Sequence, residues 1–224
     1  MFLDYIKQIQ RDGGFLYTIM RALHSHVSRR LFHARRFLIL ARELNDSSRH
    51  MKAEAAEARA ATRDDLDLLS QCGYPQFVLN QWFEQGAHAW LIEREGKLLS
   101  CYWLDGSDFY ALYNWLVIQS TPQEASILWW WVNHNNRKQG LGDQVRRLGI
   151  SEYACAGFTH ILSAVNVLNH NAIERCNKLG LKMMGHLFVL RILGITLVRF
   201  GRSWHIGRWS ANSTLNLSIE TLRR

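Results

Sequence analysis

The stretch that decides how this chain is interpreted is Val132-Asn133-His134-Asn135-Asn136-Arg137-Lys138-Gln139-Gly140-Leu141-Gly142. It follows the apolar run 127–132 and precedes an amphipathic helical pattern over residues 143–153. Glycines let a backbone approach a ligand closely, and the unpaired N–H groups at a helix start attract an anion. A strand, a basic glycine loop and a helix in this order therefore predict a cradle for a pyrophosphate group.

Two common nucleotide-binding motifs do not fit this loop. The dinucleotide fingerprint G-x-G-x-x-G would need a glycine where Val145 stands, and the sequence contains no G-x-x-x-x-G-K-[ST] motif. A short basic glycine loop before a helix is also often an ordinary turn. The loop taken alone leaves both interpretations open.

Three segments together resemble the GNAT (GCN5-related) N-acetyltransferases. Residues 137–142, Arg-Lys-Gln-Gly-Leu-Gly, resemble the acyl-CoA loop of that family, R/Q-x-x-G-x-G/A. Residues 169–181 resemble its N-x-x-A-x-x-x-Y-x-x-x-G-F segment, and residues 57–66 resemble its usual first strand and helix start. The resemblance covers about residues 55–200. It implies an α/β (α+β) fold, with a mixed, mostly antiparallel central sheet and helices on both faces.

The resemblance also implies a binding site for acetyl-CoA or another acyl-CoA. In the family, the strand before the loop pairs with the pantetheine arm and polarises the thioester carbonyl, and the loop amides hold the pyrophosphate. By position, these residues are Trp131, Val132, Asn133, Arg137, Lys138, Gln139, Gly140, Leu141 and Gly142. Asn169 matches an asparagine that contacts the cofactor arm, although an asparagine there also suits a helix cap.

Three residues are candidates for proton transfer. Cys176 stands where the family places a Tyr that protonates the leaving thiolate; a thiol could do this, and core packing is the alternative. The acceptor amine must lose a proton before it attacks, yet the strand 126–132 carries no carboxylate. Glu124 before the strand and His134 after it are therefore the candidate bases. The alternative is that Glu124 and His134 are structural or solvated and that the reaction relies on the positioning of the two substrates alone.

The remaining patterns indicate alternating strands and helices. Thr62 and Asp65 form a candidate capping box, and Glu95-Gly96 a candidate hairpin turn. We expect strands over 37–40, 56–61, 89–93, 97–104, 113–118, 126–132, 160–165, 186–191 and 195–200, and helices over 15–31, 76–84, 143–155 and 172–178. The predicted organisation is a basic N-terminal extension over residues 1–50, followed by a GNAT-like domain with a basic tail over residues 55–224.

Charge and cysteines constrain the partners. The net charge is +8, and the basic excess lies in residues 1–50 and 191–224. Such ends suit nucleic acid, an anionic membrane or a phosphorylated partner, or they form a solvated face. Nucleic acid is disfavoured because basic and aromatic residues do not interleave in the central region. The four cysteines lack metal-site or disulfide spacing, so we expect no metal and a cytoplasmic protein.

The expected function is acyl-CoA-dependent N-acyltransfer. The chain would transfer acetyl from acetyl-CoA to a primary amine of an amino sugar, a small metabolite or a protein, by direct attack in a ternary complex. One alternative is a non-catalytic acyl-CoA-binding protein, and another is an adaptor that uses its basic ends on a membrane or on nucleic acid. A contact of residues 15–36 with an anionic membrane at its inner face, and a homodimer, stay open.

Overall fold

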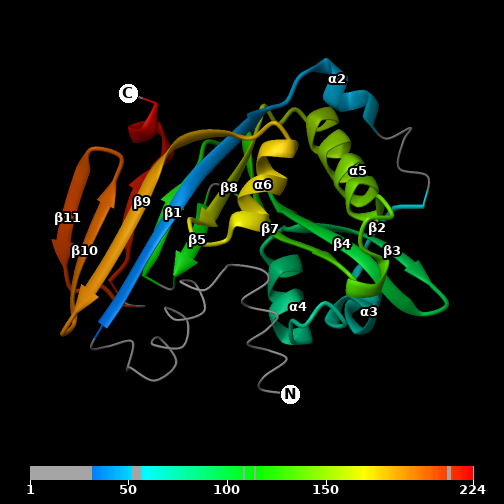
Figure 1. The fold of residues 1–224 in the computed structure, drawn as a ribbon, viewed down its shortest axis with the longest axis horizontal. Coiled ribbons are helices and arrows are strands. Elements are labelled where there is room, and N and C mark those ends of the chain that lie inside the picture. Colours follow the sequence, from blue (N-terminus) through cyan, green and yellow to red (C-terminus); the bar gives the residue numbers. More distant parts are fainter. Residues whose placement is uncertain (1–31, 52–56, 108, 114, 211–212, 224) are drawn as a thin grey trace. The chain divides into compact units, whose positions relative to one another are not determined.

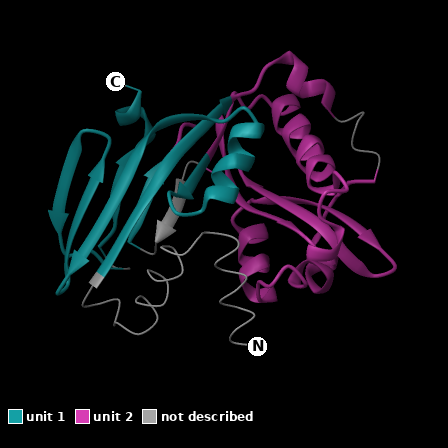
Figure 2. Ribbon diagram, in the orientation of Figure 1, with its two compact units in different colours: residues 1–42, 111–119, 163–224 teal, residues 43–110, 120–162 magenta. Residues whose placement is uncertain are grey.

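The computed structural model describes residues 32–51, 57–107, 109–113, 115–210 and 213–223 of the chain. The predicted helix over residues 15–31 lies outside the described residues. The chain divides into two compact units (Figure 2). Unit 1 comprises residues 1–42, 111–119 and 163–224, and unit 2 comprises residues 43–110 and 120–162.

Unit 2 is built on a sheet whose strand order is β2-β3-β4-β7-β8 (Figure 1). The first four strands pair antiparallel, and β7 and β8 run parallel. The predicted mixed, mostly antiparallel sheet is therefore confirmed. The strands are β2 (Arg59–Ala60), β3 (His88–Arg94), β4 (Lys97–Asp105), β7 (Glu124–Val132) and β8 (His160–Asn166). The first three residues of β8 belong to unit 2 and pair with β7, and its residues 163–166 belong to unit 1.

Helices cover both faces of this sheet, as predicted. Leu69 and Leu79, on the helices α3 and α4, join Leu91 in one apolar cluster. On the other face, a Cβ at Gly149 of α5 would come within 2.7 Å of the Trp90 ring, so the glycine lets this helix approach β3 closely. The helices of unit 2 are α2 (Asp46–Arg49), η2 (Arg63–Asp65), α3 (Leu66–Ser70), α4 (Gln76–Glu84), η3 (His134–Asn136) and α5 (Leu141–Cys155).

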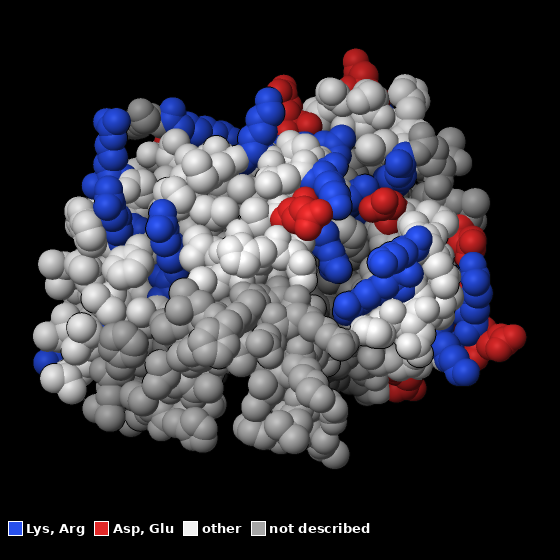
Figure 3. Space-filling model, in the orientation of Figure 1, with Lys and Arg blue, Asp and Glu red and all other residues white. Residues whose placement is uncertain are grey.

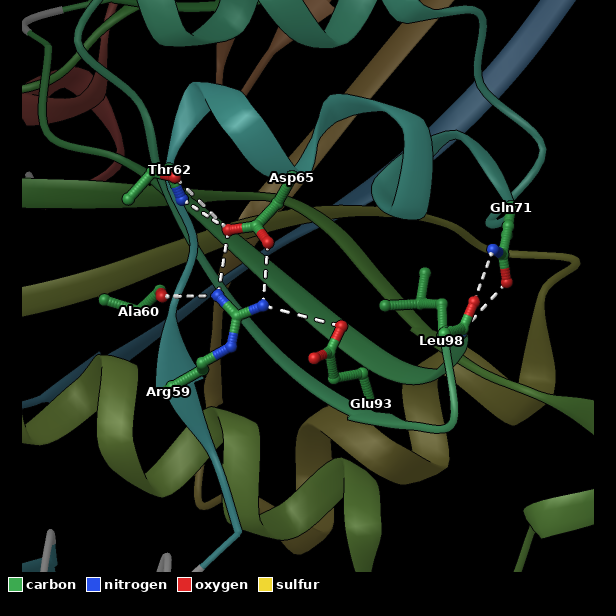
Figure 4. A network of polar contacts seen from close by, with 8 residues as sticks. Arg59, Ala60, Thr62, Asp65, Gln71, Glu93 and Leu98 are labelled. Atoms are coloured by element: carbon green, nitrogen blue, oxygen red, sulfur yellow. Dashed lines mark hydrogen bonds and ion pairs between the residues drawn. The ribbon is translucent and has the colours of Figure 1, made fainter.

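A polar network fixes the corner between β2 and η2 (Figure 4). The backbone N–H of Thr62 donates a hydrogen bond to the carboxylate of Asp65 at 2.8 Å. This is the bond from the N-cap backbone to the third residue's side chain that the predicted capping box requires. The guanidinium group of Arg59 donates to both oxygens of Asp65, at 2.7 and 2.9 Å. The hydrogen bond from Arg59, and then the one from Thr62, lower the pKa of Asp65 against the opposing effect of burial.

The hairpin between β3 and β4 turns where the sequence predicts it. Glu95 and Gly96 both have positive φ, 53° and 72°, as a two-residue hairpin turn requires. The side chain of Gln71 holds this hairpin from α3 (Figure 4), since it donates to Gly96 O at 3.2 Å and accepts from Leu98 N–H at 2.9 Å. Gln71 thus holds in place the turn that joins β3 to the central strand β4.

Unit 1 contains an antiparallel sheet with the strand order β11-β10-β9-β1, and a small sheet in which β12 pairs parallel with β6. The strands are β1 (Phe32–Glu43), β5 (Phe109–Tyr113), β6 (Leu116–Gln119), β9 (Lys182–Ile192), β10 (Ile195–Phe200), β11 (Ser203–Gly207) and β12 (Leu215–Ser218). Its helices are α6 (His170–Lys178) and η4 (Ile219–Leu222). Four antiparallel strands thus form one continuous sheet within this unit.

One predicted strand is wrong. Residues 113–118 were expected to form a single strand, whereas β5 ends at Tyr113 and β6 begins at Leu116, with a turn at Trp115. The apolar run hides this turn because it contains no glycine or proline. Two further strands, β11 and β12, were not predicted at all.

Candidate active site

The two edges of β7 are paired to different extents. On one side β7 pairs with β4 from Ser126 to Val132. On the other side, among the residues that the structure describes, its parallel ladder with β8 has three pairs and ends at Ser126 and Leu162. Beyond Ser126, the second half of β7 therefore has an edge with no strand partner inside unit 2.

The register shows which amides of β7 face that edge. The N–H of Asn133 donates to Leu99 O at 2.8 Å, so it points toward β4. Amide directions alternate along a strand. The N–H of Trp131 therefore also points toward β4, and the N–H groups of Trp130 and Val132 point away from it. Of the three strand residues predicted to meet the cofactor, Val132 is the one that offers an N–H at this edge.

A β-bulge lies at the point where the ladder with β8 ends. Trp103 of β4 is opposite Trp129, but the next residue, Leu104, is opposite Ile127. Leu128 is thus an extra residue in β7. Such a bulge bends its strand and increases the local twist, and bulges are common beside active sites. The bulge reorients the end of β7 that leads into the glycine loop.

The two glycines of the loop have different structural roles. Gly140 has φ +76°, the left-handed conformation that L residues rarely adopt, and it caps α5. Gly142 lies in the first turn of α5, where a Cβ would come within 2.8 Å of Val132 Cγ2 and 2.9 Å of Trp130 Nε1. Gly140 therefore shapes the turn, and Gly142 lets the helix pack directly on β7.

Five consecutive amides of the loop are available to a ligand. Within the described part of the chain, no hydrogen bond uses the backbone N–H groups of residues 138–142. The next N–H, that of Asp143, donates to Gly140 O at 3.0 Å. These amides lie at the N-terminus of a helix of 15 residues, where the helix dipole adds positive potential. The exposed side chains of Arg137 and Lys138 add formal charge.

The acidic residue of this helix start is neutralised from within α5. Asp143 forms an ion pair of 3.2 Å with Arg146, whose side chain is largely buried. The guanidinium carbon of Arg146 also lies 5.6 Å from the centre of the Trp130 ring. The first turn of α5 is thus tied to β7, and its one carboxylate does not cancel the positive potential of the loop.

The structure does not bring both candidate bases to the loop. His134 is exposed in η3, directly after β7. Glu124 is fully buried at the opposite end of β7, and its carboxylate accepts the N–H of Thr121 at 2.8 Å. Eight strand steps separate Glu124 from Val132, a distance of about 26 Å. Glu124 therefore stabilises the turn before β7. Its role as a base stays a prediction.

The two predicted site residues of unit 1 lie on α6. Asn169 is the N-cap of this helix, and its side chain accepts the N–H of Ala172 at 3.2 Å, as the alternative interpretation of this residue predicts. Cys176 is buried, with 6% of its surface exposed, which agrees with the packing alternative.

Within the described residues, no group of three or more His, Cys, Asp or Glu side chains is placed to hold a metal ion. Nor is any helix of this part of the chain long and apolar enough to span a membrane.

A separate pocket of about 520 Å³ lies in unit 2 at the C-terminal end of α5. Trp90, Tyr153 and Phe158 line it, and Trp90 donates its indole N–H to Glu152 at 2.9 Å. The helix is about 22 Å long, because each residue adds 1.5 Å. The pocket therefore belongs to the other end of α5 from the glycine loop.

Comparisons with known proteins agree with this architecture. No protein-family model and no curated protein sequence matches the chain. A solved structure from Novosphingobium aromaticivorans, described as a GNAT-family acetyltransferase, is 14% identical with a TM-score of 0.51, and the match covers 76% of this chain and 66% of that one. A ribosomal-protein-alanine N-acetyltransferase from Brucella melitensis is 18% identical with a TM-score of 0.44, over 55% of this chain and 82% of that one.

The match to the Novosphingobium structure establishes the fold. The identities are low, and the chain spans just under two thirds of the Novosphingobium protein. The shared feature is a mixed sheet with helices on both faces, and the first match has the same arrangement over most of this chain. The chain has the GNAT fold, as the three sequence segments predict.

Proposed function

We propose that this chain, which has the GNAT fold, is an acyl-CoA-dependent N-acyltransferase of the cytoplasm. It transfers acetyl from acetyl-CoA to a primary amine of an amino sugar, a small metabolite or a protein, by direct attack in a ternary complex. The observation that carries this proposal is the run of five amides, 138–142, which have no hydrogen bond within the described residues and lie at the start of α5.

The loop suits a pyrophosphate group. Its five N–H groups and the dipole of α5 favour two negative charges, and Arg137 and Lys138 are exposed beside them. No atom lies within 4 Å of the position that a Cβ at Gly140 would take, so the space outside the turn is open. Residues 137–142 would therefore hold the diphosphate of acetyl-CoA, whose thioester supplies the acetyl group.

The free edge of β7 suits the pantetheine arm. The N–H group of Val132 points away from β4, toward the edge that has no strand partner in unit 2. An extended amide chain can add to such an edge as another strand would. A fixed N–H there would also stabilise the oxyanion that forms when an amine attacks the thioester carbonyl.

The same three residues stay the candidates for proton transfer. His134 stays the candidate base because it is exposed and follows β7 directly. Cys176 stays the candidate acid for the leaving thiolate. Glu124, which is buried at the start of β7, stays the other candidate base and would act through water. Much of the rate can come from holding amine and thioester together, which lowers the demand on either group.

Calorimetry with acetyl-CoA tests the cofactor site. Gly140→Asp places a carboxylate against the pyrophosphate and should abolish measurable binding. Gly140→Asn is the matched control, because it has the same shape without the charge and asparagine tolerates positive φ. We expect the asparagine variant to retain most of the affinity. A folded wild-type protein that binds neither acetyl-CoA nor a longer acyl-CoA would overturn the proposal.

A non-catalytic acyl-CoA-binding protein is the second candidate. It is favoured by the absence of a carboxylate from the strand residues 126–132 and by Cys176 in place of the family's tyrosine. Thiol release from acetyl-CoA separates the two candidates. Release that depends on an added amine supports the transferase, and tight binding without release from any amine of a broad panel supports the binding protein.

A further inference from the structure

Four strands of unit 1 align arginine and aromatic side chains in one row. Arg36 on β1 is directly opposite Phe188 on β9, and Phe188 is directly opposite Arg199 on β10. Arg199 is in turn opposite Trp204 on β11. Directly opposed residues of antiparallel strands project from the same face of a sheet. The face therefore carries the sequence Arg, Phe, Arg, Trp across four neighbouring strands, about 4.8 Å apart.

This row lines a groove of about 960 Å³ that belongs wholly to unit 1. Arg202 and His186 also line the groove, and η4 forms one wall through Thr221 and Leu222. None of the residues that line it is acidic. On the face that Figure 3 draws, basic side chains likewise gather over β9, β10 and β11 with few acidic neighbours.

The positive charge of the groove is not neutralised by the described residues. None of the described carboxylates forms an ion pair with Arg36, Arg199 or Arg202. Arg36 contacts His186 Nδ1 at 3.5 Å, and Arg199 donates to Gly201 O at 3.3 Å. Burial first, and then Arg36 and Arg199, lower the pKa of His186. The charges of Arg36 and Arg199 thus add to the effect of burial on this imidazole.

The aromatic part of the row is accessible. Trp204 is 53% exposed, and the guanidinium carbon of Arg199 lies 5.2 Å from the centre of its ring. Phe188 is half-buried between the two arginines. A ligand that fills this groove has to offer negative charge and flat apolar faces at a spacing of a few ångströms. Nucleotides combine these two features, because each carries a phosphate and a base.

We propose that the groove binds single-stranded nucleic acid. The guanidinium groups of Arg36, Arg199 and Arg202 take the phosphates, and the bases stack on Trp204, on Phe188 and on the arginine planes. A duplex hides the faces of its bases, so only an unpaired strand can use the aromatic part of the row. This site lies in unit 1 and does not depend on the proposed acyl transfer.

Fluorescence anisotropy of labelled 12-nucleotide RNA and DNA strands with the full chain tests the proposal. Arg36→Gln/Arg199→Gln should weaken binding at least tenfold, and should reduce the salt slope by about 1.4, since each lost phosphate contact on a single strand removes about 0.7. Trp204→Ala should weaken binding about fivefold or more, because stacking on one base is lost. The RNA and DNA strands show which sugar the groove prefers.

Two further variants keep the test interpretable. Arg202→Gln removes a charge that makes no hydrogen bond or ion pair among the described residues, so it leaves the fold intact and should reduce the salt slope by about 0.7. Arg63→Gln, an exposed arginine of unit 2, should change nothing. Far-UV circular dichroism checks that each variant is folded.

Several outcomes would overturn the proposal. The proposal fails if the wild type binds neither the RNA nor the DNA strand. It also fails if Arg63→Gln weakens binding as much as the groove variants do, or if a duplex binds as tightly as a single strand. Tighter binding to vesicles of anionic lipid, unaffected by Trp204→Ala, would replace it with a membrane surface. Loss of binding in the double variant with no effect of Trp204→Ala would reduce the groove to a general polyanion site.

Discussion

Gly142 and Gly140 show how neighbouring residues of one type can do unrelated work. The sequence interpretation gave both glycines the same role, close approach of backbone to a ligand. In the structure, Gly140 supplies a left-handed φ, and Gly142 supplies the space in which α5 meets Val132 and Trp130. Only the first of these roles concerns the exposed side of the loop.

Replacement of Gly142 by alanine should destabilise unit 2. The new Cβ would lie 2.8 Å from Val132 Cγ2, and a valine side chain has little freedom to move. Overpacking of this kind costs about 1–3 kcal/mol, and the better helix propensity of alanine offsets about 1 kcal/mol. We expect a net loss of about 1 kcal/mol in urea unfolding.

The comparison with Gly140 sharpens this prediction. Gly140→Ala has no steric conflict but meets a positive φ, whereas Gly140→Asn tolerates that φ better. The asparagine variant should therefore be the more stable of the two. A Gly142→Ala variant as stable as the wild type would mean that α5 does not pack on β7 as described.

At the scale of elements, the corner between β2 and η2 depends on one carboxylate. Asp65→Asn removes the ion pair with Arg59 and weakens the cap on Thr62 N–H. Arg59 is nearly half exposed, which reduces the value of the pair. We expect a loss of about 1 kcal/mol at pH 7 in urea unfolding.

The effect should depend on pH in a definite direction. The pKa of Asp65 is lowered in the folded chain, so its contribution is fully present above the pKa of the unfolded state and is lost as pH falls through the folded value. The stability difference between wild type and Asp65→Asn should be constant from about pH 6 to pH 8 and shrink below about pH 4. Asp64→Asn, which alters an exposed neighbour without an ion pair among the described residues, is the control. A difference that grows toward low pH would contradict this assignment.

The elements around the loop were predictable, and some others were not. Apolar runs, helical periodicity and glycine turns mark β3, β4, α4 and α5 in the sequence, because these patterns act over a few residues. The expected strand over 113–118 fails because the one turn-favouring residue before Trp115, Asn114, stands alone in an otherwise apolar run. β11 and β12 are only five and four residues long. Polar and apolar residues alternate in both, a strand signal that the sequence interpretation missed because it extends over so few residues.

At the scale of the molecule, the sequence does not show which residues of neighbouring strands are paired. The amides of Trp130 and Val132 point away from β4 only because of how β7 pairs with it. Glu124 appeared close to the loop in sequence terms, but an extended strand carries it about 26 Å away. The arginine and aromatic row of unit 1 likewise joins residues that are far apart along the chain. The sequence interpretation disfavoured nucleic acid because basic and aromatic residues do not interleave in the central region, whereas this row joins Arg36 to residues 188–204 across strands.

The GNAT fold does not by itself specify the ligand of this chain. Structures with this low identity share the arrangement of the sheet and helices, and the chemistry has to come from the residues at the site. Here the specific feature is the set of five amides without a partner among the described residues, at positions 138–142. The account therefore depends on whether these amides meet a pyrophosphate.

An amide-resolved NMR titration with acetyl-CoA tests this most directly. The account predicts that the cross-peaks of residues 138–142 shift most, together with that of Val132. S-acetylpantetheine, which has the thioester arm but no pyrophosphate, should shift Val132 and leave residues 138–142 in place. Shifts confined to other parts of the chain, or no shift at residues 138–142 at saturating acetyl-CoA, would contradict the account.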